Sequence, residues 1–510
     1  MSNKPVPEIV IGLVGAIGTD LDAVADELGS SLLRFAYQTE KVRISEGLLD
    51  LFETSTRSDA FVDVRIRNAM HAGTELRTKL KRGDAPVALA VQEIRRRRVQ
   101  VTTAAETLRE STAYVVRSLK HPLEVQRLRF IYRTHFVCLG VYMPRHQRVD
   151  HLADQVAVSH GKRAEEYRGT AEELVQIDEK EVGTKLGQNV RDTFPLADYF
   201  IDGSDPTKLK VGIERFFDLL FGHPFKTPTR SEFGMFHARA AALRSAALAR
   251  QVGASICTSE GDVQAVGMNE VPKAGGGHYW PNDDGDARDF ARGHDQNDRI
   301  KQAVIRELLL ELKERRLLLP QYQEMSPDGI VAASSTNGKR LFQDTMLAGV
   351  TEFGRDVHAE MSALMTAARL GVSTQKSTMC VTTFPCHNCA KHIVAAGVDR
   401  VYYIEPYAKS FAQEFYPDSI AVEGRGNASA RVAFTPFEGV APRKYLEWFQ
   451  WDDRKDSSGS GIAVKWVAPD AAPRFADPAT TGGMDPSYSE REEYLLGEIF
   501  RGMKQAGIVT

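Results

Sequence analysis

The stretch from residue 355 to residue 405 decides the fold of the second half of the chain. It contains RDVHAEMSALMTAARLG (355–371), TMCVTT (378–383), FPCHNCAKHIVAAG (384–397) and RVYYIE (400–405). The first and third segments have the apolar spacing of amphipathic helices, whereas TMCVTT and RVYYIE are short apolar runs typical of buried strands. Gly371 and Gly397 stand where glycine commonly ends a helix. The stretch therefore predicts two helix–strand pairs in succession.

Three side chains of this stretch have the types and the spacing of a metal site. His358-Ala359-Glu360 lies on the first predicted helix, and Pro385-Cys386-His387-Asn388-Cys389 opens the second. The pattern H-x-E followed by P-C-x-x-C is the signature of zinc-dependent deaminases. A catalytic zinc takes three protein ligands and leaves its fourth position to water. We therefore predict that His358, Cys386 and Cys389 bind Zn²⁺, with the helix N-terminus favouring both thiolates.

Glu360 is the predicted proton carrier of this site. It lies two residues from His358, which places it near the metal without making it a ligand. From there it can take a proton from water and deliver protons to ring N3 and to the departing amine. The predicted reaction is hydrolysis of a cytosine-type amino group, in a free nucleotide or in a base out of its stack.

Two other interpretations of C-x-x-C are half of a structural zinc ribbon and a redox pair. A ribbon would need a second C-x-x-C or H-x-H pair to complete four protein ligands, and the sequence has none. A redox pair would not require the upstream HAE segment. Because the triad fills the protein positions, His387 and His392 are expected to be surface or neighbouring groups. Cys138, Cys257 and Cys380 lie in apolar strand-like runs and are expected to be small buried side chains.

The first half of the chain predicts a parallel α/β sheet. EIVIGLV (8–14) is typical of a buried strand, and it is followed by the turn GAIGTD and the amphipathic stretch LDAVADELGSSLL. AYVVRSL (113–119) and HFVCLGVYM (135–143) are further strands on either side of a predicted helix. Strands that alternate with helices in this way form parallel sheets.

The turn after the first strand is a damaged phosphate loop. Aligned on G-x-x-x-x-G-K-[ST], it keeps Gly15 but has Asp20, Leu21 and Asp22 in place of the second glycine, the lysine and the hydroxyl residue. Without the lysine and the hydroxyl, phosphoryl transfer loses two of its working parts. Gly15, Gly18 and Thr19 are candidates for binding a nucleotide through the loop, and a purely structural turn is an equal alternative.

Length and composition indicate a multidomain globular protein. The chain has 510 residues, 42% of them hydrophobic and 26% charged. Its formal net charge of −3 provides no overall positive potential that would attract the phosphates of a long nucleic acid. GHPFKTPT (222–229) resembles a linker, so the predicted domains are 1–226, 227–450 with an insertion at about 280–350, and a tail 451–510 with a terminal helix. The basic run Arg95–Arg98 is interpreted as a solvated helix face.

The sequence favours a cytoplasmic location. The N-terminal residues lack the pattern of an export signal, and no apolar run is long enough to cross a bilayer. Five cysteines are too few and too unevenly spread for a secreted disulfide framework.

Beyond these motifs, the chain resembles the bacterial anti-phage deoxycytidylate deaminases, in which a P-loop kinase-like domain is fused to a deoxycytidylate-deaminase-like domain. The resemblance spans most of the chain and rests on EIVIGLVGAIGTD, AYVVRSLKHPLEVQRLR, FPLADYFIDGS, LRSAALARQVGASI, GMNEVPKAGGGHYW, RDVHAEMSALMTAAR, TTFPCHNCAKHIVAAG, YIEPYAKS and FTPFEGVAPRKYLEWF. It implies an α/β protein with an N-terminal P-loop kinase-like parallel sheet and a C-terminal three-layer α/β/α cytidine-deaminase-like domain. It also implies conversion of dCTP, dCMP or both to the deoxyuridine forms, which deprives a phage of dCTP.

The resemblance also carries partners and substrate contacts. It implies a homo-oligomer, with a regulatory nucleotide or an inhibitory RNA as further partners. Carried over residue by residue, Asn269 resembles a sugar-hydroxyl contact, Tyr407 packs on the nucleotide and Ala359 lies in the substrate site. The candidate phosphate contacts are Arg250, Lys273 and Lys409. Asn269 as a plain turn residue and Tyr407 as ordinary packing are equal alternatives.

Three other functions compete with this interpretation. A deaminase of bases in RNA or single-stranded DNA would want a basic groove with interleaved aromatic residues, which the sequence near the site does not supply clearly. A nucleotide kinase with an accessory deaminase domain conflicts with the damaged loop. A non-catalytic nucleotide sensor has no need of Glu360.

Overall fold

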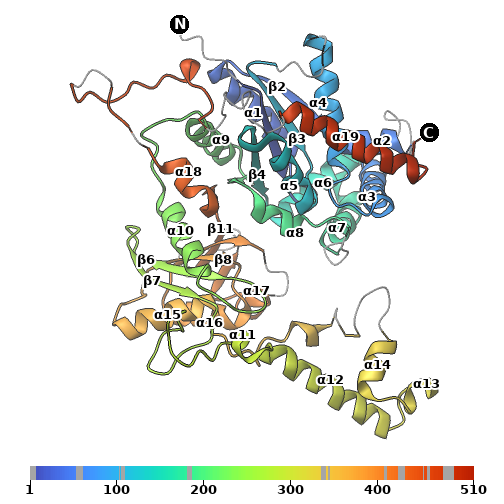
Figure 1. Cartoon of the computed structure of the whole chain (residues 1–510), viewed down its shortest axis with the longest axis vertical. Coiled ribbons are helices and arrows are strands. Elements are labelled where there is room, and N and C mark those ends of the chain that lie inside the picture. The colour runs from blue at the N-terminus through green and yellow to red at the C-terminus, as the bar shows by residue number, and fades with distance from the viewer. Residues whose placement is uncertain are drawn as a thin grey trace. The chain divides into compact units, whose positions relative to one another are not determined.

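The computed structural model divides the chain into two compact units. It describes residues 7–52, 61–102, 104, 109–180, 186–334, 341–342, 345–406, 410–422, 431–451, 453–456, 460–474 and 487–509. Unit 1 consists of Met1–Glu232 and Pro436–Thr510, and unit 2 of Phe233–Thr435. Each unit is a mixed α/β structure around one sheet in which parallel pairing prevails (Figure 1). The predicted α/β class is confirmed in both halves of the chain.

The sheet of unit 1 has the strand order β12-β5-β4-β1-β3-β2. Its strands are β1 (Ile9–Val14), β2 (Gln38–Arg43), β3 (Thr112–Arg117), β4 (Phe136–Tyr142), β5 (Tyr199–Asp202) and β12 (Gly439–Val440). β1 lies between β3 and β4 and pairs with both in parallel, with Ile9 opposite Ala113 and Val10 opposite Phe136. Only β12 runs antiparallel among the described strands of this sheet. The parallel sheet that the sequence predicted is therefore present, with β1 at its centre.

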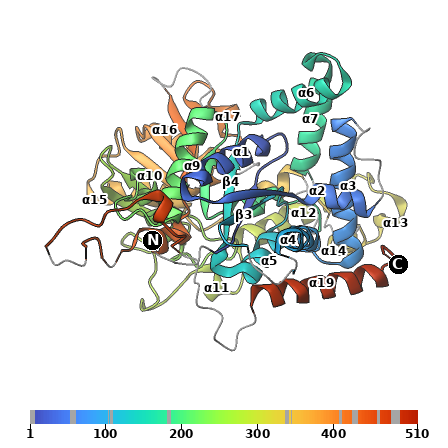
Figure 2. The ribbon, with the colours of Figure 1, turned by 90° about the horizontal axis from the view of Figure 1, so that it is seen from above.

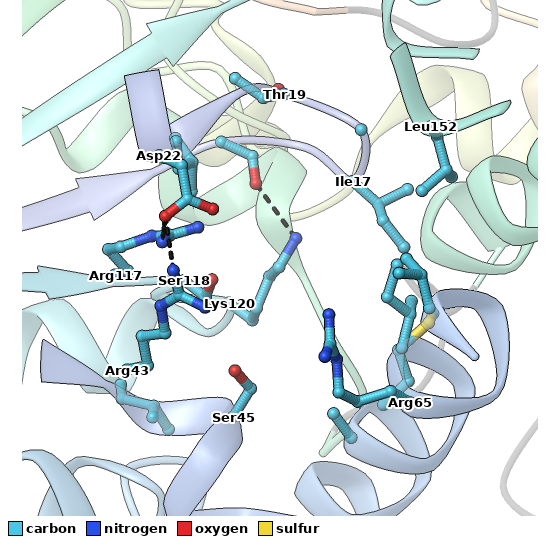
Figure 3. A pocket seen from close by; sticks show the side chains of 18 of the residues that line it. Ile17, Thr19, Asp22, Arg43, Ser45, Arg65, Arg117, Ser118, Lys120 and Leu152 are labelled. Carbon is cyan, nitrogen blue, oxygen red and sulfur yellow. Dashed lines mark hydrogen bonds and ion pairs between the residues drawn. The ribbon is translucent and has the colours of Figure 1, made fainter. Parts of the chain in front are cut away.

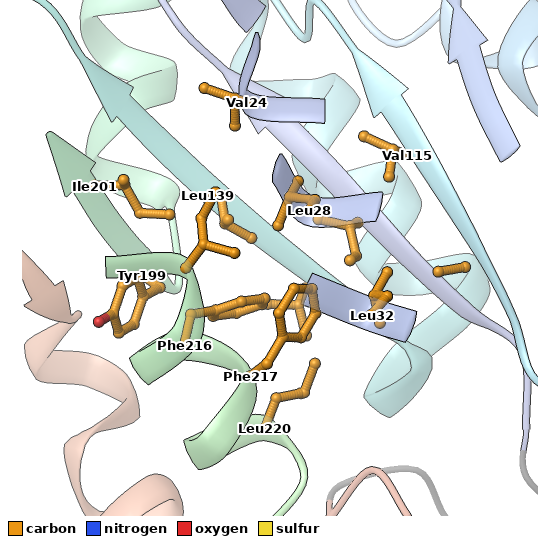
Figure 4. Close-up of a cluster of buried hydrophobic side chains, with 14 of the residues drawn as sticks. Val24, Leu28, Leu32, Val115, Leu139, Tyr199, Ile201, Phe216, Phe217 and Leu220 are labelled. Atoms are coloured by element: carbon orange, nitrogen blue, oxygen red, sulfur yellow. The ribbon is translucent and has the colours of Figure 1, made fainter. Parts of the chain in front are cut away.

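Helices cover the sheet of unit 1. They are α1 (Leu21–Leu32), α2 (Ile44–Leu51), α3 (Val62–Leu80), α4 (Val87–Thr102), α5 (Pro122–Tyr132), α6 (Arg145–His160), α7 (Ala164–Lys180), α8 (Val190–Thr193), α9 (Pro206–Leu220), α18 (Tyr445–Phe449) and α19 (Tyr488–Gln505). On one face the apolar stripes of α1 and α9 meet alternate residues of the strands (Figure 4). Ile11 and Leu13 of β1 point to this face because side chains alternate along a strand.

The C-terminal segment is built into unit 1. β12 extends the sheet by pairing with β5, and Trp448 is buried against Tyr199 and Phe216. α19 runs alongside α4 and α5 (Figure 2). The boundaries predicted from the sequence lie at residues 226 and 450, whereas the compact units divide after residues 232 and 435. The three-domain division of the sequence stays a proposal about which segments fold independently.

The basic run on α4 corrects one expectation. Arg98 is fully buried, and its guanidinium binds Glu492 of α19 through two hydrogen bonds of 2.7 and 2.9 Å. The Glu8 carboxylate, 2.9 Å from Arg98, also accepts a hydrogen bond from the Tyr488 hydroxyl. Only Arg96 keeps more than half of its side chain exposed. The run is therefore not a solvated face, because the C-terminal helix covers it.

The sheet of unit 2 has the strand order β10-β11-β9-β8-β6-β7. Its strands are β6 (Gly253–Cys257), β7 (Val263–Met268), β8 (Thr378–Thr383), β9 (Arg400–Glu405), β10 (Ile420–Val422) and β11 (Val432–Pro436). The strand-like runs GASICTS and DVQAVGMN, joined at EGD, predict a hairpin, and β6 and β7 form it in antiparallel pairing. β8 pairs with β9 in parallel. The predicted helix–strand succession from 355 to 405 is confirmed.

The helices of unit 2 lie on both faces of its sheet. They are α10 (Arg230–Ala242), α11 (Asp289–Arg292), α12 (Gln296–Glu314), α13 (Pro320–Gln323), α14 (Pro327–Ala333), α15 (Ala359–Leu370), α16 (His387–Ala395) and α17 (Ala412–Phe415). Ser255 of β6 donates a hydrogen bond to Gly234 of α10, whereas its neighbours Ala254 and Ile256 face the core formed with α15 and α16. Strand alternation thus places α10 opposite the other two helices.

Two expectations for unit 2 need correction in their bounds. The stretch SEFGMFHARAAALRSAALARQ (231–251) predicts one helix, but α10 ends at Ala242 and the chain turns before β6. The charged amphipathic pattern of residues 301–318 predicts a helix there, but α12 begins earlier, at Gln296, and ends at Glu314. Among the helices that the structure describes, none combines the length and the apolar character needed to cross a membrane.

Candidate active site

The three predicted metal ligands come together in unit 2. His358 Nδ1 lies 3.4 Å from Cys386 Sγ and 3.5 Å from Cys389 Sγ. All three ligand atoms lie within 4.8 Å of one another. Cys386 and Cys389 are buried and His358 is half-buried, so the cluster is largely shielded from water. The structure therefore brings together the His/Cys/Cys set that the spacing in the sequence predicted.

Helix ends place these side chains. His358 is the N-cap of α15 and Cys386 the N-cap of α16, so both residues precede their helices, with extended backbones. This corrects the placement of His358, which the sequence put inside the helix. Cys386 Sγ accepts the Cys389 backbone N–H at 3.4 Å, a hydrogen bond that caps α16. The positive end of the helix dipole thus acts directly on the sulfur.

The strand between the two helices sets their separation. β8 ends at Thr383, and the turn through Pro385 delivers Cys386 at its carboxyl end. The Pro385 carbonyl accepts a hydrogen bond of 2.7 Å from the Ser410 hydroxyl, which holds this turn. α15 lies close to β7 because Gly267 has no side chain there: a Cβ at this position would collide with the backbone of Ala363 and Ala359.

The ligand set suits Zn²⁺. Zinc binds imidazole nitrogen at about 2.0–2.1 Å and thiolate sulfur at about 2.3 Å, so a tetrahedral site separates them by about 3.5 Å. The observed nitrogen–sulfur distances of 3.4 and 3.5 Å agree with this requirement. One imidazole and two thiolates leave one tetrahedral position for a non-protein ligand. Zn²⁺ is the cofactor of this region.

The electrostatics of the cluster favour a thiolate. The hydrogen bond from Cys389, together with the neighbouring His358, lowers the pKa of Cys386 to about 4. Cys389 shows the opposite direction, because its hydrogen bond to the Cys386 sulfur and its burial raise its pKa. The hydrogen bond to Cys386 raises the pKa of His358 to about 9. His358, Cys386 and Cys389 thus compete for protons. A metal cation bound by all three side chains would replace these protons and end the competition.

Glu360 stands on the first turn of α15, directly behind the ligands. Its side chain is only 4% exposed, and it contacts the thiol of Cys389. Burial, reinforced by the Cys386 sulfur, raises the pKa of Glu360 to about 7. A buried carboxyl group next to a metal site is placed to exchange protons with a ligand held there. Its predicted role as proton carrier is compatible with this geometry and stays a prediction.

The histidines of the motif lie outside the ligand set. His387 is partly exposed, with Nε2 3.9 Å from Glu352, and its ring packs edge-on against Phe411 and Phe415. His392 is exposed on α16. Neither belongs to the metal-binding group found among the described residues. The three remaining cysteines are buried, and burial raises the pKa of each thiol, as expected for small core residues.

The candidate substrate contacts have mixed surroundings. Asn269 is buried, and its side-chain amide forms two hydrogen bonds with the backbone that precedes β6. Its Oδ1 accepts the Val252 N–H at 2.7 Å, and its Nδ2 donates to the Arg250 carbonyl at 2.8 Å. Arg250 is half-exposed and pairs with Glu405 at 3.2 Å, at the end of β9. Lys273 pairs with Asp283 at 2.8 Å.

Three further candidates complete this set. Ala359 is fully buried as the first residue of α15, between His358 and Glu360. Tyr407 and Lys409 lie outside the described residues. These roles in substrate binding stay predictions.

Sequence patterns did not indicate two residues that shape the site. Ser410 fixes the turn before Cys386, and Glu352 accepts a hydrogen bond of 3.1 Å from Asn388 inside the C-x-x-C motif. Both come from segments far from the motif, where a lone serine or glutamate gives no periodic or spacing signal. Only the tertiary fold reveals their contacts.

The glycine loop lies in unit 1, at the carboxyl end of β1. Gly18 has φ +81°, and a Cβ there would collide with the Arg148 carbonyl, so this position requires glycine for structural reasons. The Gly15 carbonyl accepts a hydrogen bond of 3.1 Å from Lys120 Nζ. Thr19 is a lining residue of the same cavity (Figure 3). Binding of a nucleotide by Gly15, Gly18 and Thr19 stays a prediction.

Comparison with known families defines the class of this region. Residues 228–405 match the family model described as the cytidine and deoxycytidylate deaminase zinc-binding region. The match includes α15, β8 and α16 with all three metal ligands and Glu360. The chain therefore contains a zinc-binding region of the cytidine and deoxycytidylate deaminase type.

Individual relatives are similar over short segments. "ComE operon protein 2" of Bacillus subtilis (strain 168) is 41% identical over 63 residues, 12% of this chain and 33% of the relative. "Deoxycytidylate deaminase" of Enterobacteria phage T4 is 44% identical over 55 residues, 11% of this chain and 28% of the relative, and the phage T2 protein of the same name is 44% identical over 55 residues, 11% and 29%. The chain thus spans about a third of the length of these curated relatives.

Two solved structures show a limited likeness. The dCMP deaminase from the cyanophage S-TIM5 in its apo form is 18% identical, with a TM-score of 0.21, and the match covers 41% of this chain and 99% of that one. The same protein in complex with dCMP and dUMP is 20% identical, with a TM-score of 0.22 and coverage of 41% and 98%.

Proposed function

We propose that this protein is a zinc-dependent hydrolase that removes the amino group of deoxycytidine nucleotides, converting dCTP, dCMP or both to the deoxyuridine forms and ammonia. The observation that carries the proposal is the buried Glu360 against a complete His358, Cys386 and Cys389 ligand set. A structural zinc site would have no use for a carboxyl group at this place. The match to the deaminase zinc-binding region supports the same reaction class.

In the proposed reaction, the residues of the chain bind the metal and move protons. When bound, Zn²⁺ acts as a Lewis acid that lowers the pKa of a water molecule. Glu360 accepts a proton from the attacking water and transfers it to N3 of the cytosine ring. Attack of the water oxygen forms the C4–O bond. Glu360 then takes the remaining proton of the new C4 hydroxyl and passes it to the amino group, so that the C4–N bond breaks, ammonia leaves and C4 becomes a carbonyl. The buried position of Glu360 keeps these protons from exchanging with bulk water.

The substrate class rests on the relatives and on one cation beside the site, Arg250. Two of the relatives are named deoxycytidylate deaminases. Arg250, Lys273 and Lys409 are proposed phosphate contacts, with Asn269, Ala359 and Tyr407 lining the nucleoside. The half-exposed Arg250 meets Glu405 beside the turn that carries Cys386, because Phe384 N donates to the Glu405 carbonyl at 2.8 Å. A phosphate would compete with Glu405 for this arginine.

The biological role proposed from the family resemblance is depletion of dCTP in the cytoplasm during phage infection. The same resemblance proposes a homo-oligomer whose activity responds to a regulatory nucleotide or an inhibitory RNA. Unit 1 is proposed to be a P-loop kinase-like domain, which is supported by a glycine loop that follows the central strand and leads into α1. Its lack of a lysine in the loop argues for binding rather than phosphoryl transfer.

The test is ammonia release with product identification from dCTP, dCMP, CTP, cytidine and a cytosine-containing single-stranded oligomer. The proteins are wild type, Glu360→Ala, and the control Glu414→Ala, which changes an exposed glutamate of α17 in the same unit. We expect wild type and the control to deaminate a deoxycytidine nucleotide, and Glu360→Ala to lose about 10²–10⁴-fold in rate while retaining zinc. Activity on the oligomer but not on nucleotides would overturn the substrate class, and an active Glu360→Ala would overturn the mechanism.

A further inference from the structure

A short segment of unit 2, residues 350–357, connects the inserted helices to the metal ligands. We call it the strap. It follows the insertion that contains α12, α13 and α14, and it leads directly into His358, the N-cap of α15. Because the strap and His358 are consecutive in the chain, a shift of the strap moves this ligand.

A tight turn in the strap fixes the direction of Glu352. The Gly354 N–H donates to the Thr351 carbonyl at 3.1 Å, which places Glu352 and Phe353 at the corner of a β-turn. Glu352 Oε2 accepts the Thr351 backbone N–H at 2.9 Å, so the carboxylate is held against its own turn. Its other oxygen, Oε1, is left to bind a different part of the chain.

That oxygen binds the turn that carries the two cysteine ligands. Glu352 Oε1 accepts the hydrogen bond of 3.1 Å from Asn388 Nδ2, and it lies 3.9 Å from His387 Nε2. His387 and Asn388 are the two residues between Cys386 and Cys389. The strap is thus joined to both ligand motifs, to one through the chain and to the other through Glu352.

Asn297, on the first turn of α12, holds the strap on either side of Glu352. Its Nδ2 donates to the Val350 carbonyl at 2.9 Å, and its Oδ1 accepts the Phe353 N–H at 3.3 Å. A side-chain amide offers both donors and an acceptor, so one asparagine can bind a carbonyl and an N–H together. The start of α12 therefore fixes the turn that presents Glu352.

Two further contacts hold the second half of the strap. Arg355 Nη1 donates to Asp289 at 2.6 Å and to the Ala287 carbonyl at 3.0 Å. Val357 and Glu270 exchange two backbone hydrogen bonds, of 3.0 and 3.2 Å. The position of the strap is thus set by α11, by α12 and by the chain that follows β7.

The inserted helices support the start of α12. α12 binds α14 through the ion pair of Arg306 with Asp328, at 2.9 Å, and Lys313 Nζ donates to the Met325 carbonyl at 3.2 Å (Figure 1). Since an α-helix is stiff along its axis, these contacts also limit the movement of Asn297. The insertion is therefore connected to the zinc cluster through Asn297, the strap and Glu352.

We propose that Glu352 and Asn297 are positioning residues of the zinc site: Asn297 fixes the strap, and Glu352 fixes the C-x-x-C turn through Asn388. Groups behind the metal ligands set their orientation, and loss of such a group typically costs about 10–100-fold in metal affinity or activity. Glu352 is half-exposed, so the lower end of this range applies. The effect on the metal depends on the ligand cluster alone, whereas the effect on catalysis rests on the proposed deamination.

The first test measures the rate of zinc release from the full-length protein to a chromogenic chelator, which requires no deaminase activity. Glu352→Ala and Asn297→Ala should each release zinc about tenfold faster than wild type. Glu352→Gln keeps an oxygen that accepts the Asn388 N–H, so its release should stay within about threefold of wild type. Glu307→Ala is the control, an exposed glutamate of α12, and should differ less than about twofold. Unchanged release in both alanine variants would overturn the proposal.

A double variant tests whether Glu352 acts through Asn388. If it does, Glu352→Ala, Asn388→Ala and the combination of both should accelerate zinc release by the same factor, because all three remove one contact. Multiplied effects would show that the two residues act independently. Urea unfolding of the zinc-free proteins should give the midpoint of wild type for each variant. A midpoint that falls in step with faster release would indicate loss of fold and would contradict a positioning role.

The second test is kinetic and rests on the proposed function. Misplaced ligands should lower kcat about tenfold and leave KM for a deoxycytidine nucleotide within about twofold, since neither residue is a proposed substrate contact. A raised KM with unchanged kcat would make Glu352 a substrate contact instead. If wild type deaminates no nucleotide but Glu352→Ala still releases zinc faster, the proposed function fails and the positioning role holds. Deamination by wild type with unchanged zinc release in both alanine variants would show the reverse.

Discussion

His358 and Cys386 have the same local role, because each is the residue immediately before a helix. An N-cap residue has an extended backbone and a side chain free to turn back over the first helical turn. At Cys386 this places a sulfur on the positive end of α16, and at His358 it leaves the imidazole beside Glu360. The starts of two helices, α15 and α16, with β8 between them in the chain, thus supply all three ligands of the site.

Gly267 is the residue on which the position of α15 depends. Replacing it by alanine places a Cβ against the backbone of Ala363, so α15 must shift and carry His358 with it. We expect Gly267→Ala to lower the free energy of unfolding by about 1–3 kcal/mol and to weaken zinc retention. Gly169→Ala is the control, because nothing lies within 4 Å of the added Cβ and the residue is inside α7. Denaturant unfolding and zinc content check both variants, and equal stability of the two would contradict the packing account.

At the scale of elements, α19 is the helix whose place the sequence explains least. Its apolar residues Leu495, Ile499 and Met503 repeat at four-residue spacing and are buried, as an amphipathic helix requires. Its docking also depends on Glu492, which is fully buried and binds the Arg98 guanidinium through both carboxylate oxygens. Burial raises the pKa of Glu492, an effect that Arg98 opposes.

Glu492→Ala should therefore destabilise unit 1 strongly. The change removes one of the two carboxylates that pair with the buried Arg98 and leaves Glu8, and removing one partner of a buried pair costs about 3–5 kcal/mol. Glu493→Ala, at the next and exposed position of α19, should stay within about 0.5 kcal/mol of wild type. Thermal or urea unfolding measures both. If the two variants unfold alike, α19 does not depend on this ion pair.

At the scale of the whole molecule, the chain forms two compact units with one sheet each, and the second is inserted between two parts of the first. The fold of unit 1 is complete only with the C-terminal segment Pro436–Thr510, which contributes β12, Trp448 and α19. The zinc ligands belong entirely to unit 2. Metal binding should therefore stabilise one unit directly and leave the stability of the other unchanged.

Removal of zinc by a chelator tests this separation. A ligand that binds only the folded state stabilises it by mass action, so we expect the calorimetric transition of unit 2 to fall by roughly 5–10 °C. The transition of unit 1, recognised because Glu492→Ala shifts it, should stay within about 1 °C. Readdition of Zn²⁺ should restore the first transition. A shift of both transitions by the same amount would show that the units unfold as one.

The sequence by itself determined the elements and the chemistry that depend on local order. The strand–loop–helix unit at residues 8–32, the hairpin β6–β7 and the elements around 355–405 follow from periodicity and turn residues, which act between near neighbours. The zinc triad was predictable for the same reason: its ligands fall in two short motifs whose spacing already implies two helix starts. The role of Glu360 as proton carrier could be predicted because this residue follows His358 by two positions in the same motif.

Only the tertiary structure decided the contacts between distant segments. Arg98 belongs to a basic run that indicates a solvated face, yet α19, almost 400 residues later, covers it and supplies Glu492. The cavity of unit 1 joins Lys120 to a loop whose own pattern lacks a lysine. Such contacts gain their energy from burial and charge pairing across the fold, which no local pattern records. The sequence therefore specifies which groups are available, and packing determines which of them meet.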